Sequence, residues 1–255
     1  MKNIYYFAEE IIEKASKLIL KNYKKIQSIS YKGVSNLVTN VDKEVEALII
    51  KEITSKYPNH SIIAEESGSR KKYPNYQWFI DPIDGTTNFA HNYPFFCTSI
   101  AFVKNNIIEF GLIKDPITDE LYSARKNKGA RLNGKPIFVS KTKRLNESLL
   151  ITGFPYDKRT SKMNNLKNFC NLTLLTHGVR RDGAAALDLC YVASGKVDGY
   201  WELQLAPWDV AAGVLILEEA GGKVTGFKGE KYNIFNSQII ATNRFIHREL
   251  LKNLK

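Results

Sequence analysis

Apolar residues recur at the helical period through much of the first sixty positions. In residues 4–26 they fall three or four positions apart, and residues 41–57 repeat this spacing. Side chains with that spacing share one face of an α-helix. We therefore predict two amphipathic helices. Thr39 or Asn40 is the expected N-cap of the second, because either side chain can accept a hydrogen bond from the free amides of a first helical turn.

After position 60 the pattern changes to short apolar runs separated by turn residues. Such runs are typical of buried strands. The dipeptide Asn133-Gly134 is a strong signal for a tight β-hairpin. The predicted strands lie within residues 61–67, 77–82, 95–103, 107–116, 149–154, 198–203 and 238–243.

Helical segments return among the strands in the second half of the chain. Residues 184–196 form an apolar stretch that a glycine closes, and residues 207–222 begin with a proline and close at Gly221. A last amphipathic helix is predicted from Arg244. Mixed elements with hairpins among the strands indicate an α/β (α+β) layered fold with a mixed sheet. No repeat or linker interrupts the chain, so we expect a single domain over residues 1–255.

Composition and charge narrow the class of protein. The chain has 255 residues, 44% of them hydrophobic and 25% charged, as in ordinary globular proteins. Its first twenty residues carry three glutamates within the apolar pattern, which excludes a signal peptide, and three cysteines without a CxxC pair indicate a reducing compartment. We therefore predict a cytoplasmic location and no membrane partner. The net charge of +11 allows nucleic acid as a partner, but the lysines are scattered, which favours a solvated surface.

Acidic residues stand where predicted elements begin or end. Each has an ordinary interpretation taken alone, as a helix-dipole partner near a helix start, as part of a turn or as a solvated strand end. Together they would repel one another unless cations lay between them, and oxygen-rich clusters suit Mg²⁺ or Mn²⁺. The residues are Asp42, Glu65, Glu66, Asp81, Asp84 and Asp209.

The stretch "DGTTNF", residues 84–89, adds a second kind of chemistry. Gly85 allows close backbone approach, and Thr86, Thr87 and Asn88 are residues that favour a helix N-cap. The amides of a helix start attract an anion. Carboxylates that hold metal beside amides that hold an anion indicate a metal-dependent phosphoester site.

Five segments together resemble the inositol monophosphatase family, within the lithium-sensitive, Mg²⁺-dependent phosphatases that include fructose-1,6-bisphosphatases. They follow the family's order and span most of the chain. The resemblance implies a layered α-β-α-β-α fold, a homodimer and two or three Mg²⁺ ions in each active site, with Mn²⁺ as a substitute. The segments are "LVTNVDKEVE" (37–46), "AEES" (64–67), "DPIDGTTNF" (81–89), "ALDLCYVASGKVDGYWE" (186–202) and "PWDVAAG" (207–213).

The resemblance also implies roles for individual residues. Asp42 and Thr86 would orient the attacking water, with Glu65 in a catalytic role, and Glu66 would be a supporting residue. The groups that face substrate would be Asp84, Gly85, Thr86, Ala185 and Glu202, with the phosphate on the amides of Gly85 and Thr86. The resemblance does not assign Arg181, which could contact the substrate or be a surface or dimer-interface arginine. The metal ligands would be Glu65, Asp81 and the carbonyl of Ile83 for a first ion, Asp81, Asp84 and Asp209 for a second, and Glu65 with waters for a third, weaker one.

One departure and three alternatives accompany this interpretation. Many relatives carry serine where this chain has Ala184, which concerns fine specificity rather than metal chemistry. The "DGT" stretch also resembles the haloacid-dehalogenase phosphatases, but there the two aspartates stand two residues apart, whereas here the spacing is three. The substrate could instead be fructose 1,6-bisphosphate, a nucleotide 3′-phosphate, NADP⁺ or histidinol phosphate. A nucleic-acid-binding regulator is the alternative of another class.

Overall fold

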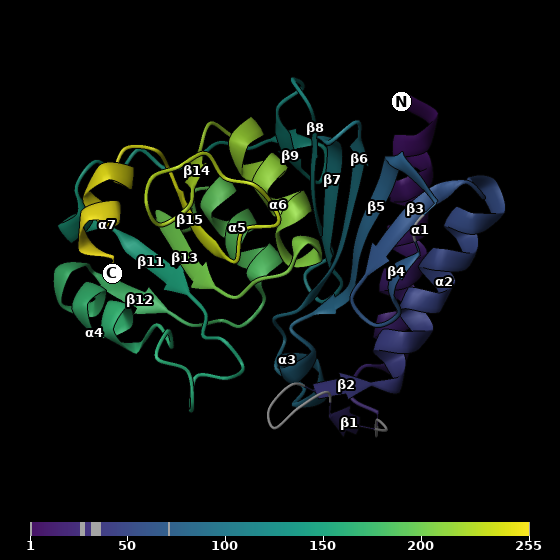
Figure 1. Cartoon of the computed structure of the whole chain (residues 1–255), viewed down its shortest axis with the longest axis horizontal. Coiled ribbons are helices and arrows are strands. Elements are labelled where there is room, and N and C mark those ends of the chain that lie inside the picture. The colour runs from purple at the N-terminus through teal and green to yellow at the C-terminus, as the bar shows by residue number, and fades with distance from the viewer. Residues whose placement is uncertain (1, 26–28, 32–36, 71, 255) are drawn as a thin grey trace.

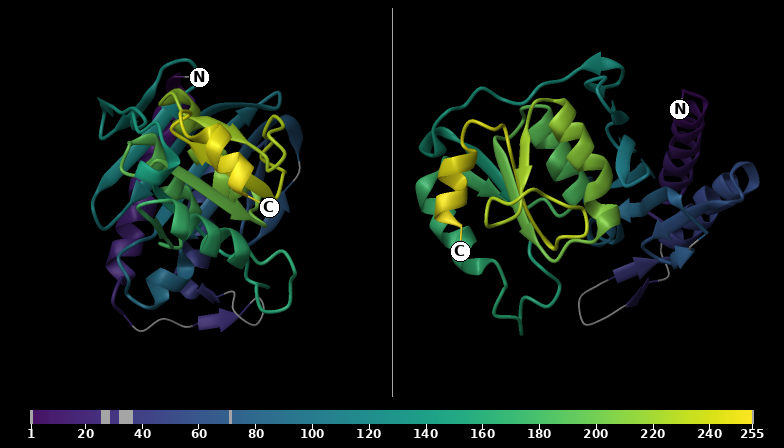
Figure 2. Two further views of the ribbon diagram at one scale, coloured as in Figure 1. Left: turned by 90° about the vertical axis from the view of Figure 1, so that its left-hand side faces the viewer. Right: turned by 45° about the horizontal axis from the view of Figure 1, so that its top comes forward.

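Helices and sheets alternate in five layers (Figures 1 and 2). The computed structural model describes residues 2–25, 29–31, 37–70 and 72–254. In these ranges two helices cover the outer face of a large sheet, two fill the space between it and a smaller sheet, and two lie outside the smaller sheet. The predicted α-β-α-β-α sandwich with mixed sheets is therefore confirmed. In that order the helices are α1 (Lys2–Asn22) and α2 (Asn40–Lys56), α5 (Ala185–Ala193) and α6 (Pro207–Glu219), and α4 (Leu166–Leu175) and α7 (His247–Asn253).

The large sheet contains eight strands within the described residues. Its spatial order is β10-β9-β8-β7-β6-β5-β3-β4, in which β3 and β5 run parallel and the other neighbours run antiparallel. The strands are β3 (His60–Ala64), β4 (Gly68–Arg70), β5 (Tyr73–Asp84), β6 (Cys97–Lys104), β7 (Ile107–Asp115), β8 (Glu120–Arg125), β9 (Ala130–Leu132) and β10 (Lys135–Pro136).

The smaller sheet has the order β12-β11-β13-β15-β14. Here β11 runs parallel to both of its neighbours, so each sheet is mixed. Its strands are β11 (Leu149–Thr152), β12 (Gly178–Arg180), β13 (Gly199–Leu203), β14 (Lys223–Thr225) and β15 (Gln238–Thr242). The remaining elements are the paired strands β1 (Ile29–Tyr31) and β2 (Leu37–Thr39), the short helix α3 (Thr86–Ala90) and the 3₁₀ turn η1 (Leu145–Glu147).

Close packing holds α6 against the large sheet. Gly111 of β7 has no side chain, and a Cβ added there would lie 2.7 Å from backbone atoms of Ala212. The glycine therefore lets the helix approach the strand at backbone distance. On the far side of the sheet α1 buries the apolar face that its periodicity predicts, including Ile11, Ile12 and Ile19. Both faces of the large sheet are thus covered, which explains its near-continuous apolar strands.

Most predicted elements are confirmed, with two differences at helix ends. Thr39 is the N-cap of α2, and the Asn133-Gly134 hairpin joins β9 to β10. The first helix ends at Asn22, short of the predicted 26, and Ile26 itself lies outside the described residues. The last helix begins at His247 rather than Arg244, because Arg244 adopts a left-handed φ of 72°.

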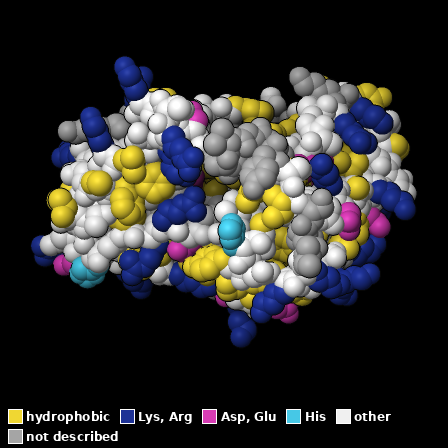
Figure 3. All heavy atoms as spheres, turned by 90° about the horizontal axis from the view of Figure 1, so that it is seen from below, with side chains coloured by type: hydrophobic (Ala, Val, Ile, Leu, Met, Phe, Trp, Pro, Cys, Tyr) yellow, Lys and Arg dark blue, Asp and Glu magenta, His cyan; other side chains and the backbone are white. Residues whose placement is uncertain are grey.

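The helices and the surface charges agree with the expectation of a globular protein with a solvated, lysine-rich surface. None of the helices in the described ranges is long and apolar enough to cross a membrane. On the face shown in Figure 3, Lys and Arg side chains are spread among polar and apolar ones and form no continuous stripe. That distribution matches the solvated surface predicted from the scattered lysines.

Candidate active site

A cavity of about 370 Å³ opens where the ends of β3 and β5 meet the first residues of α3, α5 and α6. It brings together residues from five segments that are far apart in the sequence. Asp42 is not in its lining and reaches it through Thr86. The other predicted site residues all line the cavity: Glu65, Asp81, Ile83, Asp84, Gly85, Thr86, Arg181, Ala185, Glu202 and Asp209.

A bulge in β5 places Asp81 and Asp84 together. Asp81 pairs with Ser99 of β6 and Asp84 with Cys97, so three steps along β5 match two along β6. In a regular strand residues three apart point to opposite faces, and one extra residue restores them to the same side. The strand therefore continues to Asp84, and the expectation that Pro82 ends it is wrong. A proline fits here because a bulge leaves a residue outside the ladder of hydrogen bonds.

Asp81 is almost fully buried and incompletely hydrogen-bonded. It is 2% exposed, and its Oδ1 has no hydrogen-bond partner among the described residues. Burial raises its pKa well above the ordinary value, and the charges of Glu65, Asp84, Asp209 and Asp42 raise it further. A buried carboxylate oxygen with no donor is costly unless a cation or a proton neutralises it.

Backbone amides hold both Asp84 and Asp209. Asp84 Oδ2 accepts a hydrogen bond from the amide of Ala186 at 2.6 Å, and Asp209 Oδ2 accepts one from the amide of Ala206 at 2.7 Å. Burial raises the pKa of Asp84 to about 7, and it raises that of Asp209 well above the ordinary value with the added charge of Asp84. In both side chains Oδ2 is the oxygen that accepts the amide hydrogen bond.

Asp42 and Thr86 form a buried pair at the edge of the cavity. Asp42 Oδ2 accepts hydrogen bonds from the amide and the hydroxyl of Thr39, and its Oδ1 lies 2.9 Å from the Thr86 hydroxyl. That hydroxyl is also 3.0 Å from the carbonyl oxygen of Ile83. Burial raises the pKa of Asp42, while its bonds to Thr39 and Thr86 oppose the rise. The pair joins α2 to the end of β5.

The start of α3 differs from the sequence prediction. Gly85 itself is the N-cap, with a left-handed φ of 91°, so Thr86, Thr87 and Asn88 are helical residues and not caps. A Cβ added at Gly85 would lie 3.0 Å from the carbonyl oxygen of Phe95. Glycine is therefore required both for the φ angle and for the close approach. The Asn88 amide instead ties α3 to the carbonyl of Asp182 at 2.7 Å.

Glu202 also lines the cavity. The buried Tyr200 hydroxyl donates to its Oε2 at 2.6 Å, and a Cβ added at Gly153 would collide with its carboxylate. Burial raises the pKa of Glu202 to about 7, whereas the Tyr200 hydrogen bond and the charge of Arg181 oppose the rise. Arg181 is exposed and lines the cavity. Its charge thus favours the ionised form of Glu202.

Some residues at the cavity were not predicted. The segment 153–157 after β11 forms one wall, and residues 203–206 with Trp208 complete the side next to Asp209. The local signal was a stretch with two aromatic residues, a glycine and a proline, "GFPYD", at the end of a predicted strand. Glu66, by contrast, lies outside the cavity lining, in keeping with a supporting role.

The carboxylates fit a hard divalent cation. As they stand, no three His, Cys, Asp or Glu side chains within the described ranges are grouped closely enough to enclose an ion. They are nevertheless near enough to raise one another's pKa, and Asp81 presents an oxygen without a partner. Carboxylates and a backbone carbonyl are the donors that Mg²⁺ and Mn²⁺ prefer.

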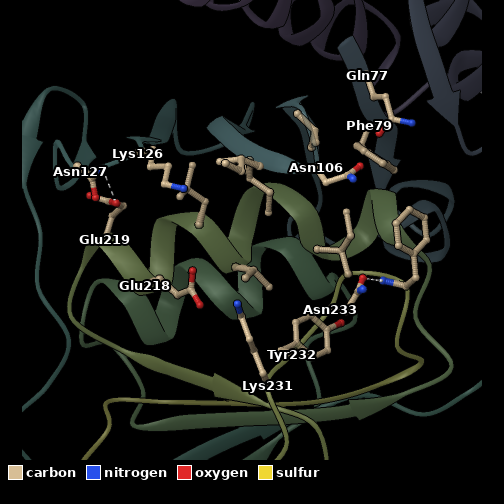
Figure 4. A pocket seen from close by; sticks show the side chains of 17 residues that line it. Gln77, Phe79, Asn106, Lys126, Asn127, Glu218, Glu219, Lys231, Tyr232 and Asn233 are labelled. Carbon is tan, nitrogen blue, oxygen red and sulfur yellow. Dashed lines mark hydrogen bonds between the residues drawn. The ribbon is translucent and has the colours of Figure 1, made fainter. Parts of the chain in front are cut away.

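A larger groove of about 870 Å³ lies elsewhere, along the side of α6 (Figure 4). Its polar residues include Lys126, Lys231, Glu218 and Glu219, and the Glu219 carboxylate accepts a hydrogen bond from the amide of Asn127 at 2.7 Å. It contains none of the predicted site residues. The chemistry indicated by the sequence therefore belongs to the smaller, acidic cavity.

Comparison with known proteins agrees with this fold. The model of the inositol monophosphatase family matches residues 1–255. The inositol-1-monophosphatase of Synechocystis is 46% identical over 245 residues, covering 95% of this chain and 85% of that protein. The Nus factor SuhB of Escherichia coli K12 is 41% identical, covering 95% and 92%. A solved inositol monophosphatase from Anabaena superimposes with a TM-score of 0.90 at 45% identity, covering 99% of this chain and 95% of that one.

The fold and the acidic cavity define a layered α/β protein with a carboxylate-rich site at its strand ends. The family match over the whole chain and relatives above 40% identity then make the assignment specific. The chain belongs to the inositol monophosphatase family.

Proposed function

We propose that the protein is a Mg²⁺-dependent phosphatase that hydrolyses a phosphate monoester on a polyol, with inositol 1-phosphate as the first candidate. The observation that carries this proposal is the cluster of buried and half-buried carboxylates around the unpartnered oxygen of Asp81, next to the amides that begin α3. Membership of the inositol monophosphatase family supports the same reaction.

Three groups of ligands would hold the metal ions. Glu65, Asp81 and the Ile83 carbonyl would hold one, and Asp81 with Asp84 and Asp209 a second, while Glu65 with waters would hold a weaker third. When bound, Mg²⁺ supplies Lewis acidity and makes a coordinated water more acidic. Mn²⁺ has the same preference for oxygen ligands and is expected to substitute.

The protein's own groups would orient the reactants. Asp42 would accept a hydrogen bond from the Thr86 hydroxyl. The oxygen of that hydroxyl can then accept a hydrogen bond from the attacking water. The amides of Gly85 and Thr86 would bind the phosphate oxygens. Glu202, ionised and oriented by Tyr200, would accept hydrogen bonds from the substrate hydroxyls beside Ala185.

A phosphate-release assay tests the proposal. We expect release from inositol 1-phosphate with Mg²⁺, none with chelator, partial recovery with Mn²⁺ and inhibition by lithium. A panel that adds fructose 1,6-bisphosphate, NADP⁺, a nucleotide 3′-phosphate and histidinol phosphate ranks the alternatives. Absence of Mg²⁺-dependent release from every member of the panel would contradict the proposal, and a trapped aspartyl-phosphate would replace water attack by a covalent route.

The proposal includes a single phosphatase domain over residues 1–255, a homodimer and a cytoplasmic location. The family match over the whole chain supports the first, and three free cysteines support a reducing compartment. A regulatory, nucleic-acid-binding role is the second candidate, because the net charge is +11 and a relative bears the name Nus factor. Binding of RNA with a steep salt dependence would favour that role.

A further inference from the structure

We propose that Glu46 is a positioning residue that holds the metal ligand Glu65 in place by clamping the turn after β3. The inference rests on the proposed function, because it gives Glu65 its role. Glu46 lies in the middle of α2 and outside the cavity lining. Its action on the site is therefore through the backbone of the turn and not through contact with a reactant.

Both carboxylate oxygens of Glu46 are used in the clamp. Oε2 accepts a hydrogen bond from the amide of Glu66, and Oε1 accepts one from the amide of Ser67, each at 2.8 Å. Glu46 is only 2% exposed. Hydrogen bonds from amides to a buried charged acceptor are among the stronger ones in proteins, so the turn has little freedom while both persist.

Glu65 is thereby fixed from two directions. Its own amide donates to the carbonyl oxygen of Ile80 on β5 at 3.2 Å, and the two following amides are held by Glu46. Glu65 is the first residue beyond β3. Its side chain lines the cavity with Asp81.

The same face of α2 also holds the Asp42–Thr86 pair. Asp42 and Glu46 are four residues apart, a spacing that places side chains next to each other along a helix. One helix face thus fixes the end of β5 through Thr86 and the end of β3 through the turn at 66–67. Loss of the Glu46 clamp would loosen Glu65 while leaving the bond between Asp42 and Thr86 intact.

Glu219 provides a matched control elsewhere in the chain. Its carboxylate also clamps a turn, by accepting hydrogen bonds from the amides of Asn127, Lys128 and Gly129 at 2.7, 3.0 and 2.8 Å. It stands ten positions after Asp209 on the same helix, a separation of about 15 Å. A variant at Glu219 therefore loses a comparable clamp far from the cavity.

The test compares Glu46→Gln with Glu219→Gln in the purified full-length protein. The glutamine keeps the shape but turns an NH₂ group toward one backbone amide, so one of the two bonds is lost. Calorimetric titration with Mg²⁺ should show an affinity about 10- to 100-fold weaker for Glu46→Gln, the usual cost of losing a group that orients a metal ligand. Glu219→Gln should also lower the melting temperature and keep the wild-type affinity for Mg²⁺.

Two results would overturn the clamp: wild-type Mg²⁺ affinity in Glu46→Gln, or an equal loss of affinity in Glu219→Gln. If Glu46→Gln does not fold, Glu46→Asp provides the same test. It keeps the charge, but its side chain is shorter by one methylene, so the oxygens lie farther from the two amides. If the wild-type protein binds Mg²⁺ but releases no phosphate, the proposed function is contradicted. The Mg²⁺ titration of the variants then still tests the role of Glu46. No Mg²⁺ binding by the wild type overturns both.

Discussion

The hydroxyl of Thr86 lies 2.9 Å from Oδ1 of Asp42, although 44 positions separate the two residues. The same hydroxyl is 3.0 Å from the carbonyl oxygen of Ile83, and with one proton it can donate to only one of these oxygens at a time. A ligand that engages the Ile83 carbonyl would leave Asp42 as the acceptor. The pair is thus placed to link occupation of the Ile83 carbonyl to the orientation of the Thr86 hydroxyl.

Thr86→Ala removes that hydroxyl and should lower kcat by about 100-fold or more, the usual contribution of a group that orients a proton transfer. The change deletes no charge, so Mg²⁺ affinity should change much less than kcat. Thr86→Ser keeps the hydroxyl and should recover most of the rate. Steady-state kinetics over a range of Mg²⁺ concentrations separates the two effects. Wild-type kcat in Thr86→Ala would remove Thr86 from the mechanism.

Asp81→Asn should stabilise the metal-free protein and abolish its response to Mg²⁺. Burial and four acidic neighbours raise the pKa of Asp81. The wild type therefore loses stability as rising pH favours ionisation of Asp81. The variant has an uncharged amide at this position and has no such loss. We expect a metal-free melting temperature higher by about 2 °C or more at pH 7.5, and at least about 100-fold lower activity.

Thermal unfolding with chelator and with Mg²⁺ measures both parts of the Asp81 prediction. In the wild type Mg²⁺ should raise the melting temperature, because a ligand that binds only the folded state stabilises it. The variant should show no such rise. A melting temperature that falls in metal-free Asp81→Asn would show that the carboxylate is satisfied by a group other than a cation.

Gly85→Ala should impair stability and activity together. A left-handed conformation costs a non-glycine residue about 1–2 kcal/mol, and the new Cβ would also stand 3.0 Å from the carbonyl oxygen of Phe95. Movement of the Gly85 amide should raise KM for the phosphate ester. Gly134→Ala is the matched control, because Gly134 has a φ of 78° and no atom within 4 Å of an added Cβ. The control should lose stability while KM, measured by phosphate release, stays unchanged.

The sequence predicted the elements whose information is local. The helix of residues 41–57 and its cap at Thr39, the Asn133-Gly134 hairpin, the strand that precedes Glu65 and the strand that contains Asp81 all follow from short-range patterns. The continuation of β5 past Pro82 does not, because it depends on the register of a bulge against β6. Local turn chemistry favoured an end at the proline, and pairing with a neighbouring strand decided otherwise.

The same distinction applies to the site. The motifs identified the acidic residues, since each lies next to a recognisable strand end or helix start. The partners that orient them were missed: Tyr200 beside Glu202, and the wall formed by residues 153–157. Their contacts cross between elements, so no spacing in the sequence reveals them. Leu166–Leu175 was likewise not predicted as a helix, and several of its leucines are exposed.

Tyr200→Phe should shift the pH dependence of substrate binding. Glu202 has a folded-state pKa of about 7, above its ordinary value because of burial, and the Tyr200 hydroxyl opposes that rise. Glu202 is therefore ionised above pH 7 and protonates as the pH falls. Without the hydroxyl its pKa moves further up, so at pH 7 fewer molecules carry the ionised form that would accept the substrate hydroxyls. The acidic limb of the kcat/KM profile should move to higher pH, and KM at pH 7 should rise.

Tyr122→Phe distinguishes this effect from the loss of any buried tyrosine hydroxyl. Tyr122 is also buried, and its hydroxyl donates at 2.7 Å to Glu120, two positions away, outside the cavity lining. Its pH profile should match the wild type even if its melting temperature falls. Because kcat/KM reports groups of the free enzyme, a shift seen in Tyr200→Phe and absent in Tyr122→Phe would assign the acidic limb to Glu202. Equal profiles in all three proteins would mean that protonation of Glu202 does not limit substrate binding.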